Sequence, residues 1–366
     1  MATILGGPQR YIQGRGVLSE LCKHLQHLGR SPFVLVSPSG KARVEEQLEK
    51  SASETGAKLT FELFRGECSR KEIDRVLSAF QSSGCDVMVG IGGGKAQDTA
   101  KAAAYYANAP VVIVPTAASS DAPCTTGSLV YSEEGVFETH LYFPTNPNIV
   151  LVDTEIISKA PPRLLVAGMG DALATFFEAR ACQQSDSNHA LGGKCTLAAM
   201  ALSKACYDTL LADGVRALSA VSAGVCTKAV ENIVEANTFL SGVGAENCGT
   251  AAAHAIHNGF TRLPETHQYY HGEKVAFGTI AQLILENAPA SELDEVLGFC
   301  LAVGLPMTLA ELGIEEIRME DLMKVAESAC GLASMRRMPF AVTPQMVCDA
   351  MLAADALGKA YKAKHA

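Results

Sequence analysis

Apolar runs alternate with helical patterns over the first 160 residues of the chain. Four short apolar runs and one alternating segment each predict a strand, at 33–36, 59–64, 87–89, 111–114 and 149–152. Between them, 44–55 and 69–80 have apolar residues at helical spacing, and Ser69 with Glu72 is typical of a helix N-terminus. This alternation indicates a largely parallel sheet, to which 129–142 adds a predicted hairpin.

The pattern changes after Pro161 and Pro162. Strand-like runs end there, and alanine- and leucine-rich segments predict helices at 171–181, 195–211, 225–240 and 275–285. Two consecutive prolines interrupt regular structure, so they predict a domain junction. We therefore expect an α/β domain over 1–161 and an all-helical domain over 162–366.

Composition narrows the class of protein. The net charge of −9 comes without any basic run, so a nucleic-acid partner is not expected. No apolar stretch reaches the length of a membrane span, and the first residues do not resemble a signal peptide. The twelve cysteines are scattered without a Cys-x-x-Cys pair, which indicates reduced thiols and a cytoplasmic protein.

A glycine-rich turn follows the predicted strand at 87–89. Gly92, Gly93 and Gly94 let a ligand approach the backbone closely, and the N-terminus of the helix that follows favours an anion. The turn therefore predicts a nucleotide diphosphate site. Its spacing matches neither the usual dinucleotide fingerprint nor the P-loop, so a plain strand-to-helix turn is the alternative.

Histidines gather in one part of the chain. Four of the nine lie within eighteen residues, at His254, His257, His267 and His271. Imidazoles suit zinc and related metals, and a catalytic site needs a third ligand, for which Asp171 is the candidate. The alternative for Asp171 is a helix N-cap, because the predicted helix starts there. Spacing alone does not select which two histidines bind.

These segments together resemble the group III, metal-dependent alcohol dehydrogenases of the iron-containing type, nearly from end to end. The resemblance rests on GIGGGKAQDTAK at 90–101, PTAASSDAPC at 115–124, GDALAT with FEAR at 170–180, AAAHAIHNG at 251–259 and YHGEKVAFG at 270–278. It implies a dehydroquinate synthase-like architecture, with an α/β nucleotide-binding N-terminal domain and an all-α C-terminal domain. Cofactor and metal would lie in the cleft between them.

The resemblance also implies the site residues. The metal, one Zn²⁺ per subunit with Fe²⁺ as the alternative, would be bound by Asp171, His254 and His271. These three and Asp121 would be the catalytic and substrate-binding residues, with His257 nearby and His267 peripheral. The NAD site would be formed by Ser37, Gly93, Gly94, Lys95, Asp98, Thr116, Ser119, Thr125, Gly127 and Tyr131.

The implied reaction is hydride transfer between NAD and the secondary alcohol of glycerol or a similar vicinal diol, giving dihydroxyacetone. Zinc would act as a Lewis acid on the hydroxyl, and Asp121 would hold the substrate or pass a proton. An Asx-type turn is the alternative role for Asp121. Family members form rings of subunits, so a homo-oligomer of the octamer type is expected.

Two positions depart from the family pattern. Ser37 stands where an acidic residue usually binds the adenosine ribose, and Lys41 and Arg43 lie nearby, so NADP becomes an alternative cofactor. Ala245 stands where many members have phenylalanine, which predicts a wider substrate pocket.

Rival functions follow from the same features. One is an NADP(H)-tolerant reductase of small aldehydes or hydroxyketones, and another is a non-catalytic nucleotide- or metal-binding protein. An enzyme of phosphorylated polyols would need basic residues near Asp121 or His271, and few are present. A dehydroquinate synthase-type lyase would need many charged side chains for an acidic substrate, and the motifs fit it less well.

Overall fold

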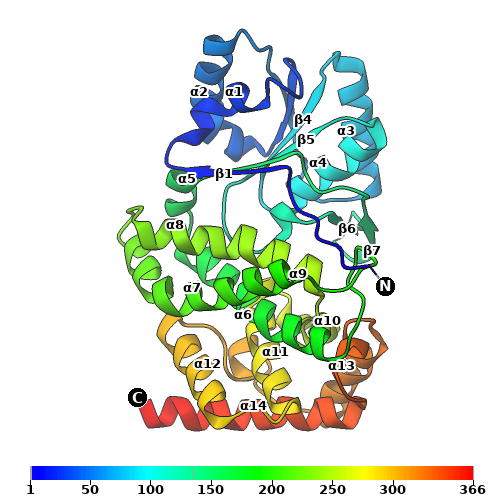
Figure 1. Cartoon of the computed structure of the whole chain (residues 1–366), viewed down its shortest axis with the longest axis vertical. Coiled ribbons are helices and arrows are strands. Elements are labelled where there is room, and N and C mark those ends of the chain that lie inside the picture. Colours follow the sequence, from blue (N-terminus) through cyan, green and yellow to red (C-terminus); the bar gives the residue numbers. More distant parts are fainter. Residues whose placement is uncertain (1, 134, 366) are drawn as a thin grey trace.

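A six-stranded parallel sheet forms the first half of the protein (Figure 1). The computed structural model describes residues 2–133 and 135–365. The sheet has the order β1-β8-β5-β4-β2-β3, and its strands are β1 (Arg10–Gly14), β2 (Pro32–Val36), β3 (Thr60–Leu63), β4 (Val87–Gly92), β5 (Val111–Pro115) and β8 (Ile149–Asp153). The predicted α/β half is thus confirmed.

Alternating side chains bury both faces of this sheet. Val34, Val36 and Val89 pack with leucines of the helices that flank β2, whereas Phe33, Leu35 and Met88 belong to the cluster on the opposite face. The helices here are η1 (Val17–Glu20), α1 (Leu21–Leu25), α2 (Pro38–Thr55), α3 (Arg70–Ser83), α4 (Gly94–Ala107) and α5 (Thr154–Ser158). A strand buried on both faces needs a continuous apolar run, which is why β2, β4, β5 and β8 were visible in the sequence.

The predicted hairpin forms, but it does not extend the main sheet. β6 (Gly127–Tyr131) and β7 (Phe137–Tyr142) make a separate antiparallel sheet of two strands. Its edge is bound by a helix: Ser128 Oγ donates to the Asp98 carbonyl, and Leu129 N donates to the Asp98 carboxylate at 3.0 Å. The hairpin therefore lies against α4 instead of pairing with a parallel strand.

The second half is helical, apart from one isolated bridge between Lys194 and Thr3. Its helices are α6 (Pro162–Gln184), α7 (Leu197–Ser222), α8 (Lys228–Glu235), α9 (Ser241–Cys248), α10 (Ala252–Phe260), α11 (His271–Leu285), α12 (Ala290–Val303), α13 (Met319–Gly331) and α14 (Pro344–His365). The last strand ends at Asp153 and α6 begins at Pro162, but the exact domain boundary stays a prediction. None of the described helices combines the length and apolarity that a membrane span requires.

One helical rod connects the two halves. α8 and α9 are joined by η3 (Ala236–Leu240), a π-helical turn, so the rod runs from 228 to 248. Several of its side chains bind the N-terminal half; for example, Asn237 Nδ2 donates to the Ala118 carbonyl at 2.9 Å, Glu246 accepts from Thr126 N at 2.6 Å, and Asn247 accepts from Gly6 N at 2.6 Å. These buried polar contacts hold the halves in register.

Candidate functional site

Asp171, His254 and His271 converge on one point, although they come from three helices. Asp171 Oδ1 lies 3.3 Å from His254 Nε2 and 3.0 Å from His271 Nε2. One ligand atom from each residue fits within 4.8 Å of the others. Asp171 is fully buried, whereas the His271 side chain is 39% exposed, so the cluster opens to solvent on that side. A carboxylate oxygen and two imidazole nitrogens at this spacing suit a divalent metal.

Close helix packing brings Asp171 to this point. The sequence suggested that a helix begins at Asp171, but this residue lies within α6. The N-cap alternative is therefore wrong. The neighbouring glycines do not end a helix; they allow contact. A Cβ on Gly272 would come 1.7 Å from the Ala167 carbonyl oxygen, and one on Gly170 would come 2.3 Å from the Gly272 oxygen. Only glycine lets α6 meet the start of α11.

The outer nitrogen of each histidine is also held. His254 Nδ1 lies 2.6 Å from Glu178 Oε2, and His271 Nδ1 lies 3.1 Å from His257 Nε2. Glu178 additionally accepts from the backbone of His254 at 2.9 Å, and it is completely buried. When Nδ1 carries the hydrogen, Nε2 of both rings offers its lone pair toward Asp171, which is the orientation that metal-binding histidines require.

Charges in the cluster are strongly coupled. Burial raises the pKa of Asp171, but His271 and His254 outweigh it and hold that pKa well below its usual range. Burial lowers the pKa of His254, yet Glu178 and Asp171 raise it well above normal. Burial, with His271, lowers the pKa of His257, which is therefore neutral. The site thus combines an ionised Asp171 carboxylate with a His254 ring whose protonated form is stabilised by nearby carboxylates. A metal cation can replace the proton that these carboxylates stabilise.

Asp121 borders this cluster. Its backbone N donates to Asp171 Oδ2 at 3.2 Å, and its own Oδ2 accepts from Ser241 Oγ at 3.3 Å. Burial and the Asp171 charge raise the pKa of Asp121 to about 7. Asp121 precedes the short helix η2 (Ala122–Cys124), but its side chain makes no capping hydrogen bond there. The Asx-turn alternative therefore lacks support, and a role beside the substrate stays a prediction.

The glycine-rich turn opens onto free space. Gly93 is the N-cap of α4, and a Cβ on either Gly93 or Gly94 would meet no atom within 4 Å. A dinucleotide diphosphate fits such a cradle, because helical N–H groups face it. β2 and β4 are neighbours whose chain connections leave in opposite directions, which is the usual nucleotide position in such sheets. Ser37 follows β2 at the same edge and caps α2.

Lys95 and Tyr131 lie together near this turn. Lys95 Nζ is 2.6 Å from Glu67 and 5.6 Å from the centre of the Tyr131 ring. Asp98 is buried and bound by Lys101 Nζ at 2.9 Å as well as by the β6 backbone. These contacts give Asp98 a structural role, and its contact with a cofactor stays a prediction.

The remaining predicted cofactor residues lie on the loop after β5 and at the start of β6. Thr116 N donates to the Gly92 carbonyl at 3.1 Å, and Ser119 is half-buried further along. Thr125 Oγ1 donates to the Ala122 carbonyl at 3.1 Å. Gly127 is tightly packed, since a Cβ there would come 2.1 Å from a His140 ring nitrogen. One loop thus touches both the glycine-rich turn and the Asp171 cluster.

His267 lies outside the cluster of Asp171, His254 and His271. His267 is exposed, and its Nε2 lies 2.9 Å from the Thr261 carbonyl oxygen. Sequence reasoning gave no role to Glu178 or Glu246, the two buried carboxylates that hold this region. A signal for Glu178 was present, because a spacing of seven residues places it on the same helical face as Asp171.

Known relatives match the whole chain, and a family model matches its N-terminal part. The family model described as iron-containing alcohol dehydrogenase matches residues 8–154. The chain is 48% identical over 365 residues to a glycerol dehydrogenase from Citrobacter freundii, covering 100% of both. It is 43% identical over 360 residues to a glycolaldehyde reductase from Halobacterium salinarum, covering 98% of this chain and 99% of the relative.

A solved structure agrees as well. The crystal structure of glycerol dehydrogenase from Schizosaccharomyces pombe superposes with a TM-score of 0.95 at 36% identity, covering 99% of this chain and 93% of that one. Sequence relatives of full length and a matching fold together place the protein: it belongs to the iron-containing alcohol dehydrogenase family.

Proposed function

We propose that the protein is a metal-dependent, NAD-linked dehydrogenase that oxidises the secondary alcohol of glycerol to dihydroxyacetone and catalyses the reverse reduction. The observation that carries this proposal is the convergence of Asp171, His254 and His271 beside Asp121. The name of the Citrobacter freundii relative, identical at 48% of positions, supports glycerol as the substrate.

Zinc is the proposed metal. Two imidazoles and a carboxylate form the donor set common in catalytic zinc sites, with iron(II) as the alternative. A divalent cation supplies Lewis acidity that lowers the pKa of an alcohol. Metal analysis of the purified protein, and reconstitution of chelated protein with zinc or iron(II), test the choice.

The chain's own residues orient the site. Glu178 favours hydrogen on Nδ1 of His254, and His257 Nε2 would accept a hydrogen from Nδ1 of His271, so that both ligand Nε2 atoms would be available. Asp121, next to the cluster, can hold a proton on its carboxyl oxygen near neutral pH. The Gly93 and Gly94 cradle would fix the dinucleotide, and fixed positions of both reactants lower the barrier to hydride transfer.

NADH formation with glycerol and propane-1,2-diol, before and after chelation, tests the function. His254→Ala should lose metal and activity, whereas the matched control His267→Ala, on an exposed and peripheral ring, should keep both. No turnover of any diol or hydroxyketone by zinc- or iron-loaded protein would favour the non-catalytic alternative and overturn the proposal.

Three further properties are proposed on family resemblance. Ala245 is buried in α9, and its small side chain would widen the substrate pocket. Activity on butane-2,3-diol relative to glycerol should then fall in Ala245→Phe. A cytoplasmic location and a homo-oligomeric ring of the octamer type are also proposed; light scattering of the eluted protein measures the assembly directly.

A further inference from the structure

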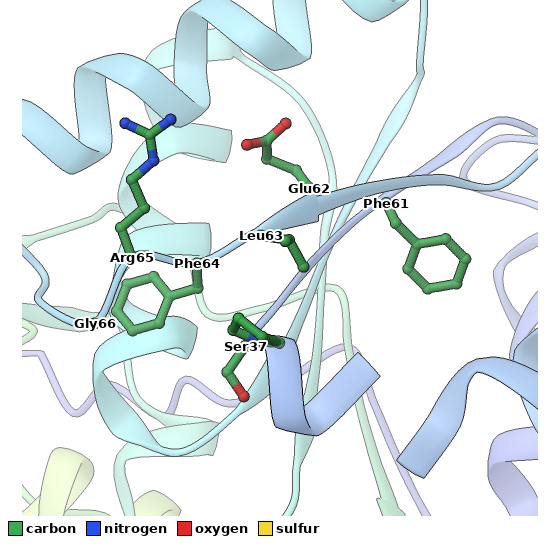
Figure 2. Close-up of a pocket in the computed structure, with 8 residues that line it drawn as sticks. Ser37, Phe61, Glu62, Leu63, Phe64, Arg65 and Gly66 are labelled. Carbon is green, nitrogen blue, oxygen red and sulfur yellow. The ribbon is translucent and has the colours of Figure 1, made fainter. Parts of the chain in front are cut away.

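A cavity of about 890 Å³ lies at the ends of β2 and β3 (Figure 2). It is lined by Ser37, Pro38 and the segment 61–66. β2 lies between β3 and β4 in the sheet, and β4 leads into the glycine-rich turn. A dinucleotide whose diphosphate rests on that turn therefore extends its adenosine half over this cavity. The inference below rests on the proposed function, which places a dinucleotide here.

No free carboxylate faces this cavity among the residues that line it. Glu62 is the only acidic residue of the lining, and it is paired with Arg75, which also binds Glu72 at 2.7 Å. Ser37 lies where β2 ends; its Oγ accepts from Gly40 N at 3.1 Å and can still donate its hydrogen. Enzymes that select NAD place a carboxylate near the ribose 2′-hydroxyl, and that carboxylate would repel a phosphate.

Arg65 supplies positive charge at the rim. Its backbone N donates to Glu72 at 2.9 Å, but its guanidinium makes no hydrogen bond or ion pair within the described chain. The side chain is exposed, and in Figure 2 it points away from Ser37, so a contact with a phosphate beside Ser37 requires another side-chain rotamer. A planar guanidinium is the group best suited to bind a phosphate through two hydrogen bonds.

The other basic residues nearby are already engaged. Lys41 Nζ pairs with Glu45 at 3.1 Å and lies 4.9 Å from the centre of the Phe61 ring, so it covers an aromatic wall of the cavity. Arg43 Nε donates to the Ser39 carbonyl at 3.2 Å and does not line the cavity. Arg65 is therefore the one lining cation without a partner in the described chain.

We infer that Arg65, together with Ser37, allows this site to bind a dinucleotide phosphorylated on its adenosine 2′-hydroxyl, that is NADP, as well as NAD. The 2′-phosphate would accept hydrogen bonds from the Arg65 guanidinium and the Ser37 hydroxyl. The start of α2, an eighteen-residue helix that Ser37 caps, adds its dipole.

Kinetics with both cofactors and direct binding of adenosine fragments test the inference. The native protein should turn over NADP, and it should bind adenosine 2′,5′-bisphosphate more tightly than AMP in calorimetry. Arg65→Ala should lower kcat/KM for NADP, and the affinity for the bisphosphate, by about 10- to 100-fold, the loss typical of a charged hydrogen bond. NAD turnover and AMP binding should change by less than about threefold. Ser37→Asp should weaken NADP and bisphosphate binding further, by charge repulsion.

Arg30→Ala is the matched control. Arg30 is also exposed, but it lies before the N-terminal end of β2, whereas the cavity lies at the C-terminal end of that strand. Equal losses for both cofactors in Arg65→Ala, or a native protein that binds the bisphosphate no better than AMP, would overturn the inference. NAD turnover without NADP binding would remove this inference alone. Arg65-dependent bisphosphate binding without turnover of any alcohol would support it and instead contradict the proposed function.

Discussion

Glu178→Gln should weaken metal binding without touching a ligand. Glu178 accepts from His254 Nδ1 at 2.6 Å, from Ala251 N at 2.8 Å and from His254 N at 2.9 Å. If the new amide oxygen keeps the two backbone donors, its NH₂ group faces His254 Nδ1. Two donors cannot face each other, so the ring must move its hydrogen to Nε2, the atom that points to the cluster.

The size of the effect follows from that change. Loss of such an orienting partner typically lowers metal affinity about 10- to 100-fold, which is about 1.4 to 2.8 kcal/mol. The metal-free protein should also lose about 1 to 3 kcal/mol of unfolding free energy, because a buried charged hydrogen bond is removed. Competition with a chromogenic zinc chelator measures affinity, and urea unfolding measures stability.

Glu246→Gln is the control for this substitution. Glu246 is also a buried carboxylate that accepts a backbone hydrogen bond, from Thr126 N at 2.6 Å, but it contacts none of the three proposed ligands. It should lower stability while leaving zinc affinity unchanged. Zinc affinity of Glu178→Gln within about threefold of the native protein, or an equal loss in Glu246→Gln, would refute the orienting role.

Three other substitutions test separate parts of the molecule. Gly272→Ala must push α11 away from α6, because the new Cβ would lie 1.7 Å from the Ala167 oxygen. We expect the free energy of unfolding in urea to fall by about 3 kcal/mol or more, and the metal content to fall as well. An unfolding curve in urea like that of the native protein would contradict this expectation. Asp121→Asn should lower kcat about 100-fold at unchanged metal content, and an unaltered kcat would exclude its proton-holding role. Glu311 is half-buried, and burial raises its pKa, but bonds from Lys362 and the Met307 N–H outweigh this and lower it. The unfolded chain then binds more protons, so this stabilisation is complete above the ordinary pKa of 4.5 and is lost as pH falls through the lower folded value. Glu311→Gln should cost about 1 kcal/mol in urea at neutral pH and less below pH 4.5, and a gap that widens in acid would contradict that sign.

Much of the fold could be predicted because buried strands carry continuous apolar runs. β2, β4, β5 and β8 are of this kind. β1 (Arg10–Gly14) was missed, since it lies at the edge of the sheet and its sequence, RYIQG, is polar and only half-buried. Its parallel pairing with β8 depends on a partner some 139 residues away, from Arg10 to Ile149, which local patterning does not reveal.

The site was predictable in kind but not in detail. Clustered histidines and Asp171 suggested a metal, while the choice of His254 and His271 came from the family motifs. The predicted helix containing Asp171 began at 171, whereas α6 begins at Pro162. Gly168 and Gly170 look like helix breakers in the sequence, but in the structure they lie within α6, where they allow close contact with neighbouring backbone. Arg65 gave no sequence signal at all; only the cavity and its lack of a partner distinguish it.

The rod formed by α8, η3 and α9 has a consequence for motion. Asn237 anchors the sheet-bearing half from the middle of this rod, and the consecutive residues Glu246 and Asn247 anchor it near the rod's end. Displacement of one half against the other at the rod would break these hydrogen bonds and leave buried polar groups without partners, which costs free energy. We therefore expect any movement between the halves to leave these contacts in place, so that structures with and without nucleotide superpose best along 237–247.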